Sequence, residues 1–332
     1  MEKIMLSHGA GGQQSAAFIK RIILKYFGNP VLNSLEDAAL LKNTPPDIAF
    51  TTDSFVVDPV FFPGGNIGDL AVCGTVNDLA VRGARPKYIS LSLILEEGLA
   101  FADLKKILAA AAARAKEAGV TVACGDTKVV PRGKCDKIFI NTAGIGHMLK
   151  NAAISPANIR VGDIVIASGA LGGHSLAVMN ARHKLGIKAD LKTDSAPLNK
   201  MTAALIEALG PRVKAMRDIT RGGLSTVLNE LAGKRAGFEI EEQKIPVLPA
   251  ARATAALLGL DILDMANEGS IVCVLSPDAA ERALRIMRAD KYGKNAQIIG
   301  RAVEGGKVLL ATALGVHRLL RPPLGDVLPR IC

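Results

Sequence analysis

Acidic residues at the ends of short segments are the first candidates for chemistry in this sequence. Asp37 lies in EDAAL, Asp53 in TTDS, Asp78 in TVNDLA and Asp126 in CGDTK, and Asn77 precedes one of them. Mg²⁺ takes oxygen ligands, usually one or two carboxylates together with phosphate and water. If folding gathers these acids, they predict a site for a metal-bound nucleotide. Asp is also common at turns and helix caps, so each could instead be structural.

Glycine-rich segments could supply the backbone that such a nucleotide needs. They occur at 9–12, at 63–65 and at 218–223, where Arg221 adds a positive charge at the start of a predicted helix. Exposed backbone N–H groups and helix N-termini bind phosphate well. Glycine-rich stretches are also ordinary loops.

The apolar pattern predicts the elements that must hold these residues. Residues 101–118, for example, place Phe101, Leu104 and Ile107 on one helical face and stop at Gly119. The same reasoning predicts helices over 15–27, 67–82, 197–209 and 222–234 and from residue 174, and strands over 48–52, 88–95, 120–123, 138–145, 163–167, 238–245, 271–275 and 308–312. We therefore expect an α/β (α+β) protein.

The length of 332 residues fits two domains. A polar stretch at 150–160 marks the boundary. From His317 onward the apolar residues show no helical or strand periodicity, and three prolines favour an extended, mobile chain. The stretch from Pro322 to Cys332 could reach about 30 Å. We predict an N-terminal segment and helix (1–35), two domains (36–150 and 155–316) and a flexible C-terminal tail (317–332).

Bulk properties exclude several classes of protein. Five scattered cysteines form no CxxC pair, which argues against a zinc ribbon or a disulfide framework and favours a reducing cytoplasm. No apolar run approaches the roughly 18 residues of a membrane span, and no signal peptide is recognisable. The net charge is +10, but the basic residues are spread along the chain and form no basic run. Aromatic residues are few as well, so we expect no nucleic-acid partner.

Motifs along nearly the whole chain resemble those of one known family. The motifs are HGAGG at His8, EDAAL around Asp37, TTDSFVVDPVFFPGGNIGDLAVCGTVNDLA from Thr51, ILEEG from Ile94, GDTKVV from Gly125, RDITRGG from Arg217, NEG from Asn267 and the terminal PRIC. Together they resemble HypE, the carbamoyl dehydratases of [NiFe]-hydrogenase maturation. Aminoimidazole ribonucleotide synthetase, selenophosphate synthetase and thiamine-phosphate kinase are related enzymes, but FFPGGNIGDLA joined to PRIC separates HypE from them.

This resemblance implies a two-domain PurM-like ATP-binding architecture that forms a homodimer through its first domain. It implies that Asp37, Asp53, Asp78 and Asp126 hold Mg²⁺ and that these acids, Asn77, Asp218, Gly11, Gly12, Arg221, Gly222 and Gly223 bind ATP. Expected partners are the carbamoyltransferase HypF and the HypC–HypD complex, which receives cyanide.

The resemblance also implies the reaction. A carbamoyl group on the thiol of Cys332 is phosphorylated by ATP and loses phosphate to become a thiocyanate. Lys128 and Glu268 match the family positions for the proton transfers, although either could instead bind phosphate or serve the structure. The sequence does not decide which of the two is the base.

Two other functions predict different behaviour. A small-molecule kinase or synthetase of the same superfamily would keep its turnover after the tail is trimmed. A basic adaptor without enzymatic activity would bind polyanions in a strongly salt-dependent way and would hydrolyse no nucleotide.

Overall fold

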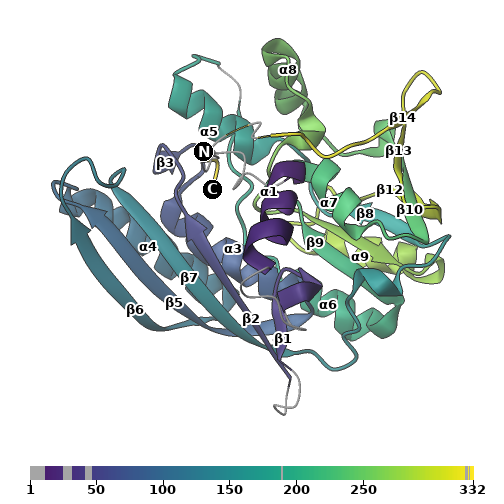
Figure 1. The fold of residues 1–332 in the computed structure, drawn as a ribbon, viewed down its shortest axis with the longest axis horizontal. Helices are drawn as coiled ribbons and strands as arrows, with labels where there is room; N and C mark the ends of the chain where they lie inside the picture. Colours follow the sequence, from purple (N-terminus) through teal and green to yellow (C-terminus); the bar gives the residue numbers. More distant parts are fainter. Residues whose placement is uncertain (1–11, 25–31, 42–46, 188–189, 326–327, 329) are drawn as a thin grey trace.

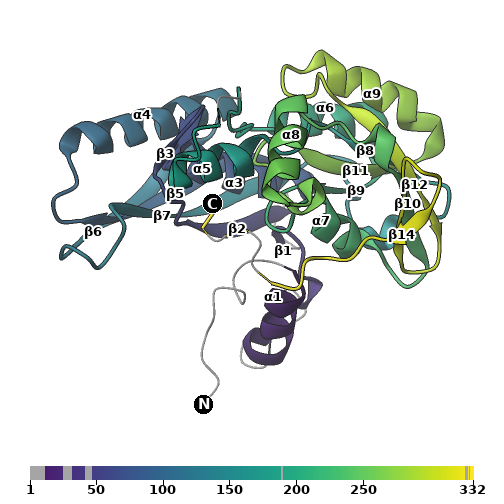
Figure 2. The ribbon, with the colours of Figure 1, turned by 90° about the horizontal axis from the view of Figure 1, so that it is seen from above.

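The first domain is a sheet covered by two helices on one face (Figures 1 and 2). The computed structural model describes residues 12–24, 32–41, 47–187, 190–325, 328 and 330–332. In this part of the chain the sheet order is β1 (Ala39–Leu41), β2 (Ile48–Phe55), β7 (Ile138–Met148), β5 (Ala84–Glu96) and β6 (Thr121–Val130). Neighbouring strands are antiparallel except for the parallel pair β5–β6.

The two covering helices differ in how much of their surface is buried, because they have different neighbours. In α3 (Ile67–Val81), every residue but Asp78 is buried, since the helix lies against the sheet, α4, and elements of the second domain. Its start is fixed by a capping box between Asn66 and Asp69. In α4 (Phe101–Ala118), only the inner face is buried, and Gly119 ends the helix in the left-handed conformation. The apolar α3 therefore connects both domains.

The second domain is a larger sheet with helices on both faces. Its order is β14 (His317–Leu319), β13 (Val308–Ala311), β10 (Ala236–Glu241), β12 (Gln297–Glu304), β8 (Ile164–Ala167), β11 (Ile271–Leu275) and β9 (Val213–Asp218). The helices are α5 (Gly173–His183), α6 (Asn199–Leu209), α7 (Gly223–Leu231), α8 (Pro249–Leu258) and α9 (Ala280–Ala289). One apolar cluster includes residues of α7 and another includes residues of α6 and α9, so the sheet is buried between two layers.

Short elements complete the described chain. A hairpin, β3 (Phe61–Phe62) with β4 (Gly65–Asn66), leads into α3. Near the start, α1 (Gly12–Phe18) continues as a π-helical turn over Ile19–Ile23. In the described residues, none of the helices combines the length and the apolar character that crossing a membrane requires.

Most predicted elements are present, and the mixed α/β class is confirmed. The helix at 101–118 is found with the predicted bounds, whereas the strand expected at 238–245 ends at Glu241 because residues 242–244 form a 3-10 turn. The pattern did not lead us to assign β9, α8, α9 or β12. The segment assigned to the tail contains β14, which pairs with β13, so the described chain leaves the sheet only after Leu319.

Candidate active site

Three carboxylates from distant parts of the chain meet between the two domains. Asp37 precedes β1, Asp78 lies on α3, and Asp218 ends β9. One oxygen atom of each lies within 4.8 Å of the others. Thr51, on β2, links two of them. Its hydroxyl can donate a hydrogen bond to Asp78 Oδ2, 2.8 Å away, or to the carbonyl oxygen of Asp37, 3.0 Å away.

Burial and mutual repulsion make this cluster costly to ionise. Burial, and then the charge of Asp37, raise the pKa of Asp218 to about 8. Burial raises the pKa of Asp37 to about 6 although Arg217 Nε lies 3.1 Å from its carboxylate. Burial and the neighbouring acids hold the pKa of Asp78 well above its usual value. Buried carboxylates that repel one another are the donor set that a hard divalent cation stabilises.

Asp53 adds a fourth carboxylate next to the cluster. It lies on β2, and Thr75 of α3 donates a hydrogen bond of 2.8 Å to its Oδ2. Burial raises its pKa, while Thr75 and the charge of Arg221 lower it. Arg221 belongs to the turn between β9 and α7, where Gly222 and Gly223 both have positive φ values. The sequence 218–223 thus places an acid and a cation at the same edge of the sheet.

Glu268 lies at the cluster with a buried oxygen that has no hydrogen-bond partner in the described structure. Its exposed fraction is 3%, and the unpartnered atom is Oε1. Burial and then the charge of Asp218 raise its pKa well above the usual value. Asp194 holds its backbone by accepting N–H bonds from Glu268 (2.9 Å) and Gly269 (3.1 Å). A buried carboxyl group with one oxygen free of hydrogen bonds and a raised pKa is suited to accept a proton.

The C-terminus lies at the same place. The carbonyl oxygen of Cys332 accepts a hydrogen bond of 3.1 Å from Val56 N–H, and that of Arg330 accepts one of 3.4 Å from Asp58 N–H. Burial raises the pKa of the Cys332 thiol to about 12, Arg221 lowers it, and Glu268 and two acids raise it further. The last cysteine is therefore within the electrostatic reach of the acid cluster.

The structure gathers only part of the predicted site. Asp37, Asp53, Asp78, Asp218, Arg221, Glu268 and Cys332 come together, and Gly222 and Gly223 lie in the adjoining turn. Asn77 is 1% exposed and bonds the carbonyl oxygens of Ala196 and Glu268 and the N–H of Leu198. Gly12 begins α1, whereas Gly11 lies outside the described residues.

Asp126 and Lys128 lie apart from the cluster, on the edge strand β6. Their side chains are 61% and 71% exposed and form an ion pair of 3.5 Å with each other. Every residue of β6 but Val130 is exposed. Within one chain these two residues therefore face solvent.

Sequence reasoning missed the residues that orient the site. Thr51, Thr75, Arg217, Asp194 and His174 contact the acids, the Glu268 loop or the tail. Thr51 and Thr75 lie in the long motif that starts at Thr51, and Arg217 begins RDITRGG, so the motifs contained a signal for these three. His174 and Asp194 lie in no motif, and only the tertiary structure brings them to the site.

Comparison with known proteins defines the class and then the family. The model of the AIR synthase related N-terminal domain matches residues 35–148, and that of the C-terminal domain matches 160–311. Carbamoyl dehydratase HypE of Escherichia coli (strain K12) is 44% identical over 338 residues, covering 100% of both chains. The chain therefore belongs to the AIR synthase related proteins and, among them, to the HypE carbamoyl dehydratases.

Solved structures agree with this assignment. A HypE structure in a HypE–HypF complex is 45% identical with a TM-score of 0.88, covering 92% of this chain and 100% of that one. A HypE structure in complex with ATP is 45% identical with a TM-score of 0.83, covering 99% and 100%. The PurM-like two-domain fold expected from the motifs is confirmed.

Proposed function

We propose that this protein uses ATP to dehydrate a carbamoyl group on its own Cys332, which gives a thiocyanate that supplies cyanide for the iron of [NiFe]-hydrogenase. The observation that supports this most strongly is the place of Cys332. Its thiol lies beside the buried acids and beside Glu268, whose Oε1 has no partner in the described structure. A nucleotide enzyme acting on a free small molecule would have no need of its own terminus there.

The first step transfers a phosphoryl group. The oxygen of the carbamoyl group attacks the γ-phosphorus of ATP, the bond from phosphorus to the bridging oxygen breaks, and ADP leaves. The acids Asp37, Asp78 and Asp218, with Asp53 beside them, would hold Mg²⁺, which offsets the phosphate charge. Arg221 and the backbone of Gly222 and Gly223 would contact phosphate oxygens.

The second step forms the nitrile. The nitrogen loses both protons, one to a base of the protein and one to the departing phosphate, as the C–O bond breaks with phosphate as the leaving group and a carbon–nitrogen triple bond forms. We assign Glu268 as the proton acceptor because it is buried near Cys332, whereas Lys128 lies on β6, apart from Cys332 within one chain, and pairs with Asp126. The raised pKa of Glu268 makes its carboxylate a stronger base than an ordinary one.

The tail must leave this site to be loaded. Because burial raises the pKa of Cys332 to about 12, the docked thiol remains protonated near neutral pH and is a poor nucleophile. HypF would therefore add the carbamoyl group when the tail is outside. The cyanide would pass to a HypC–HypD acceptor in the same exposed state, in the cytoplasm.

The exposed sheet of the first domain supports a homodimer. Phe50, Tyr88, Val122, Val129 and Ile145 are large apolar residues exposed on its strands, and β6 leaves one edge unpaired among the described residues. An apolar sheet surface of this kind is typical of an interface. Pairing of two copies would bury β6 and give Asp126 and Lys128 contacts that a single chain lacks.

Mass spectrometry of the C-terminal peptide tests the proposal. The chain is incubated with HypF, a carbamoyl donor and Mg-ATP. We expect a carbamoyl adduct on Cys332 that loses one water only with ATP, and no adduct in Cys332→Ala. ATP consumption with an unmodified Cys332 would instead favour the small-molecule kinase or synthetase.

A further inference from the structure

A buried histidine contacts the tail next to the reactive cysteine. His174 lies in the first turn of α5, is fully buried, and has its Nε2 2.8 Å from the carbonyl oxygen of Ile331. Its Nδ1 lies 2.8 Å from the hydroxyl of Thr193, and its ring meets Phe62 edge to face. Both ring nitrogens of His174 therefore have a polar partner, Nε2 the carbonyl oxygen of Ile331 and Nδ1 the hydroxyl of Thr193.

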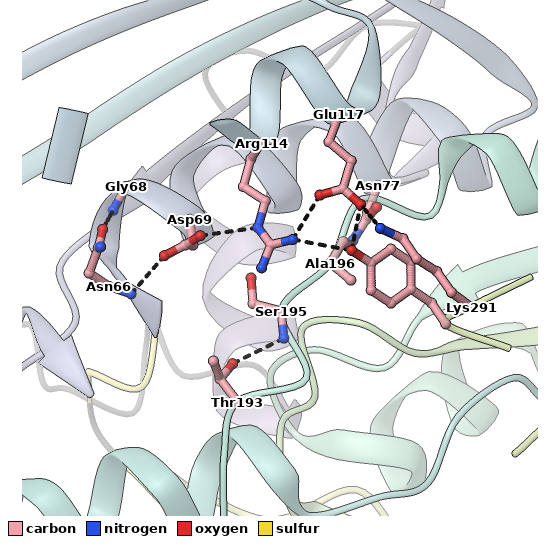
Figure 3. A network of polar contacts seen from close by, with 11 residues as sticks. Asn66, Gly68, Asp69, Asn77, Arg114, Glu117, Thr193, Ser195, Ala196 and Lys291 are labelled. Atoms are coloured by element: carbon pink, nitrogen blue, oxygen red, sulfur yellow. Dashed lines mark hydrogen bonds and ion pairs between the residues drawn. The ribbon is translucent and has the colours of Figure 1, made fainter. Parts of the chain in front are cut away.

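These partners determine which nitrogen carries the proton. A carbonyl oxygen only accepts hydrogen bonds, so Nε2 must carry hydrogen and donate it to Ile331. Thr193 Oγ1 accepts a bond of 3.0 Å from Ser195 N–H, as Figure 3 shows, and its own hydrogen can point to Nδ1. Burial lowers the pKa of His174, which keeps the ring neutral with Nδ1 as an acceptor. The segment from Thr193 therefore orients the ring.

The neighbouring residues hold the backbone of the tail and the side chains of Arg330 and Ile331: Arg330 Nε donates a hydrogen bond of 2.9 Å to the carbonyl oxygen of Val56, and Arg330 pairs with Asp136. Arg182, also on α5, donates to the carbonyl oxygens of Arg330 and Asp58. The side chain of Ile331 is 4% exposed and belongs to the apolar cluster with Phe62 and Val178. The donors on α5 and residues 56–58 thus hold the three last carbonyl groups, and His174 holds the middle one.

We propose that His174 is the positioning residue for the reactive tail: its Nε2–H fixes the carbonyl of Ile331 and thereby the reach of the Cys332 thiol into the acid cluster. This inference rests on the proposed function, because it names what aligns the carbamoyl group in that site. Thr193 acts through His174 by setting its tautomer.

Alkylation of the cysteines tests this in the full chain without ATP or a carbamoyl donor, so its failure is distinguishable from failure of the proposed activity. Cys124 on β6 lies far from the tail, so its rate, whether or not the proposed dimer covers it, should be the same in every variant and serves as a reference, and the buried Cys73 and Cys273 report unfolding. Loss of one buried hydrogen bond corresponds to about a tenfold change in an equilibrium. In His174→Leu we therefore expect Cys332 to react with iodoacetamide about tenfold faster, while Cys73 and Cys273 remain protected.

Three further variants make the experiment decisive. His174→Gln can place an amide N–H near the position of Nε2 and should restore most of the protection, whereas His183→Gln, an exposed residue on the same helix, should change nothing. Thr193→Val should accelerate the reaction of Cys332 even if His174→Leu unfolds and exposes Cys73. An unchanged Cys332 rate in Thr193→Val and in a folded His174→Leu overturns the proposal.

Discussion

Asp218→Asn should stabilise the protein without metal and abolish its response to Mg-ATP. Folding raises the pKa of Asp218 from 3.8 to about 8. A lone carboxylate with that rise would cost roughly 6 kcal/mol of folding free energy at a pH above the folded pKa. Because the neighbouring acids share protons with Asp218, the actual cost is smaller. We expect Asp218→Asn to raise the free energy of unfolding by about 2 kcal/mol at pH 8. For a chain of this size that is roughly a 3 °C rise in Tm.

The sign of the pH dependence follows from the same shift. The cost is absent below the unfolded pKa of 3.8 and grows as the pH rises to about 8, so the unliganded wild type should lose stability over this interval. Asp218→Asn should lose less, and the two Tm values should converge near pH 4.

Differential scanning fluorimetry between pH 5 and 8, with and without Mg-ATP, measures both effects. The wild type should gain stability with Mg-ATP because the ligand binds only the folded chain, whereas Asp218→Asn should not. Asp103→Asn, which removes a partly exposed acid on α4, is the matched control and should behave as the wild type. An Asp218→Asn protein that is less stable than the wild type at pH 8, or that keeps the Mg-ATP response, would refute this reasoning.

Three further predictions concern the base, the interdomain contact and the dimer. Glu268→Gln should load carbamoyl on Cys332 normally but convert it to thiocyanate at least about 100-fold more slowly, as single-turnover mass spectrometry would show; an unchanged rate would exclude Glu268 as the base. Asn77→Ala leaves a buried N–H and two carbonyl groups without their partner and should cost about 2 kcal/mol in urea unfolding, whereas a neutral result would mean that water replaces it. Val129→Lys places a charge on a side chain that is 68% exposed in one chain, and light scattering should detect a shift toward monomer; an intact dimer would place the interface elsewhere.

Local patterns predicted the elements whose signal is contained in their own residues. The apolar face of 101–118 and the glycine after it suffice to define α4, because helical spacing and a left-handed stop are local properties. The amphipathic pattern of α9 was equally available, since Ala283, Leu284 and Met287 form its buried face. The strand β9 was harder to predict, because Lys214 and Arg217 interrupt its apolar residues and Arg217 turns toward the acid site.

In the candidate site, too, the sequence predicted the individual residues, and only the fold showed which of them meet. The motifs identified Asp37, Asp78 and Asp218 as separate acids, but spacing along the chain could not show which of the predicted acids meet. Asp126 has as clear a motif as the others, yet β6 holds it at an exposed edge of the sheet.

The sequence alone therefore determined the family, the identity of the acids and the presence of a cysteine at the end of a proline-rich tail, because those properties depend on residue type and order. Only the tertiary structure decided that α3 and β9 bring two acids to the loop before β1, and that His174 lies under Ile331. Contacts between residues as distant as 174 and 331 depend on how the two domains pack. No local pattern records that packing, since the free energy that selects it comes from burial summed over both domains.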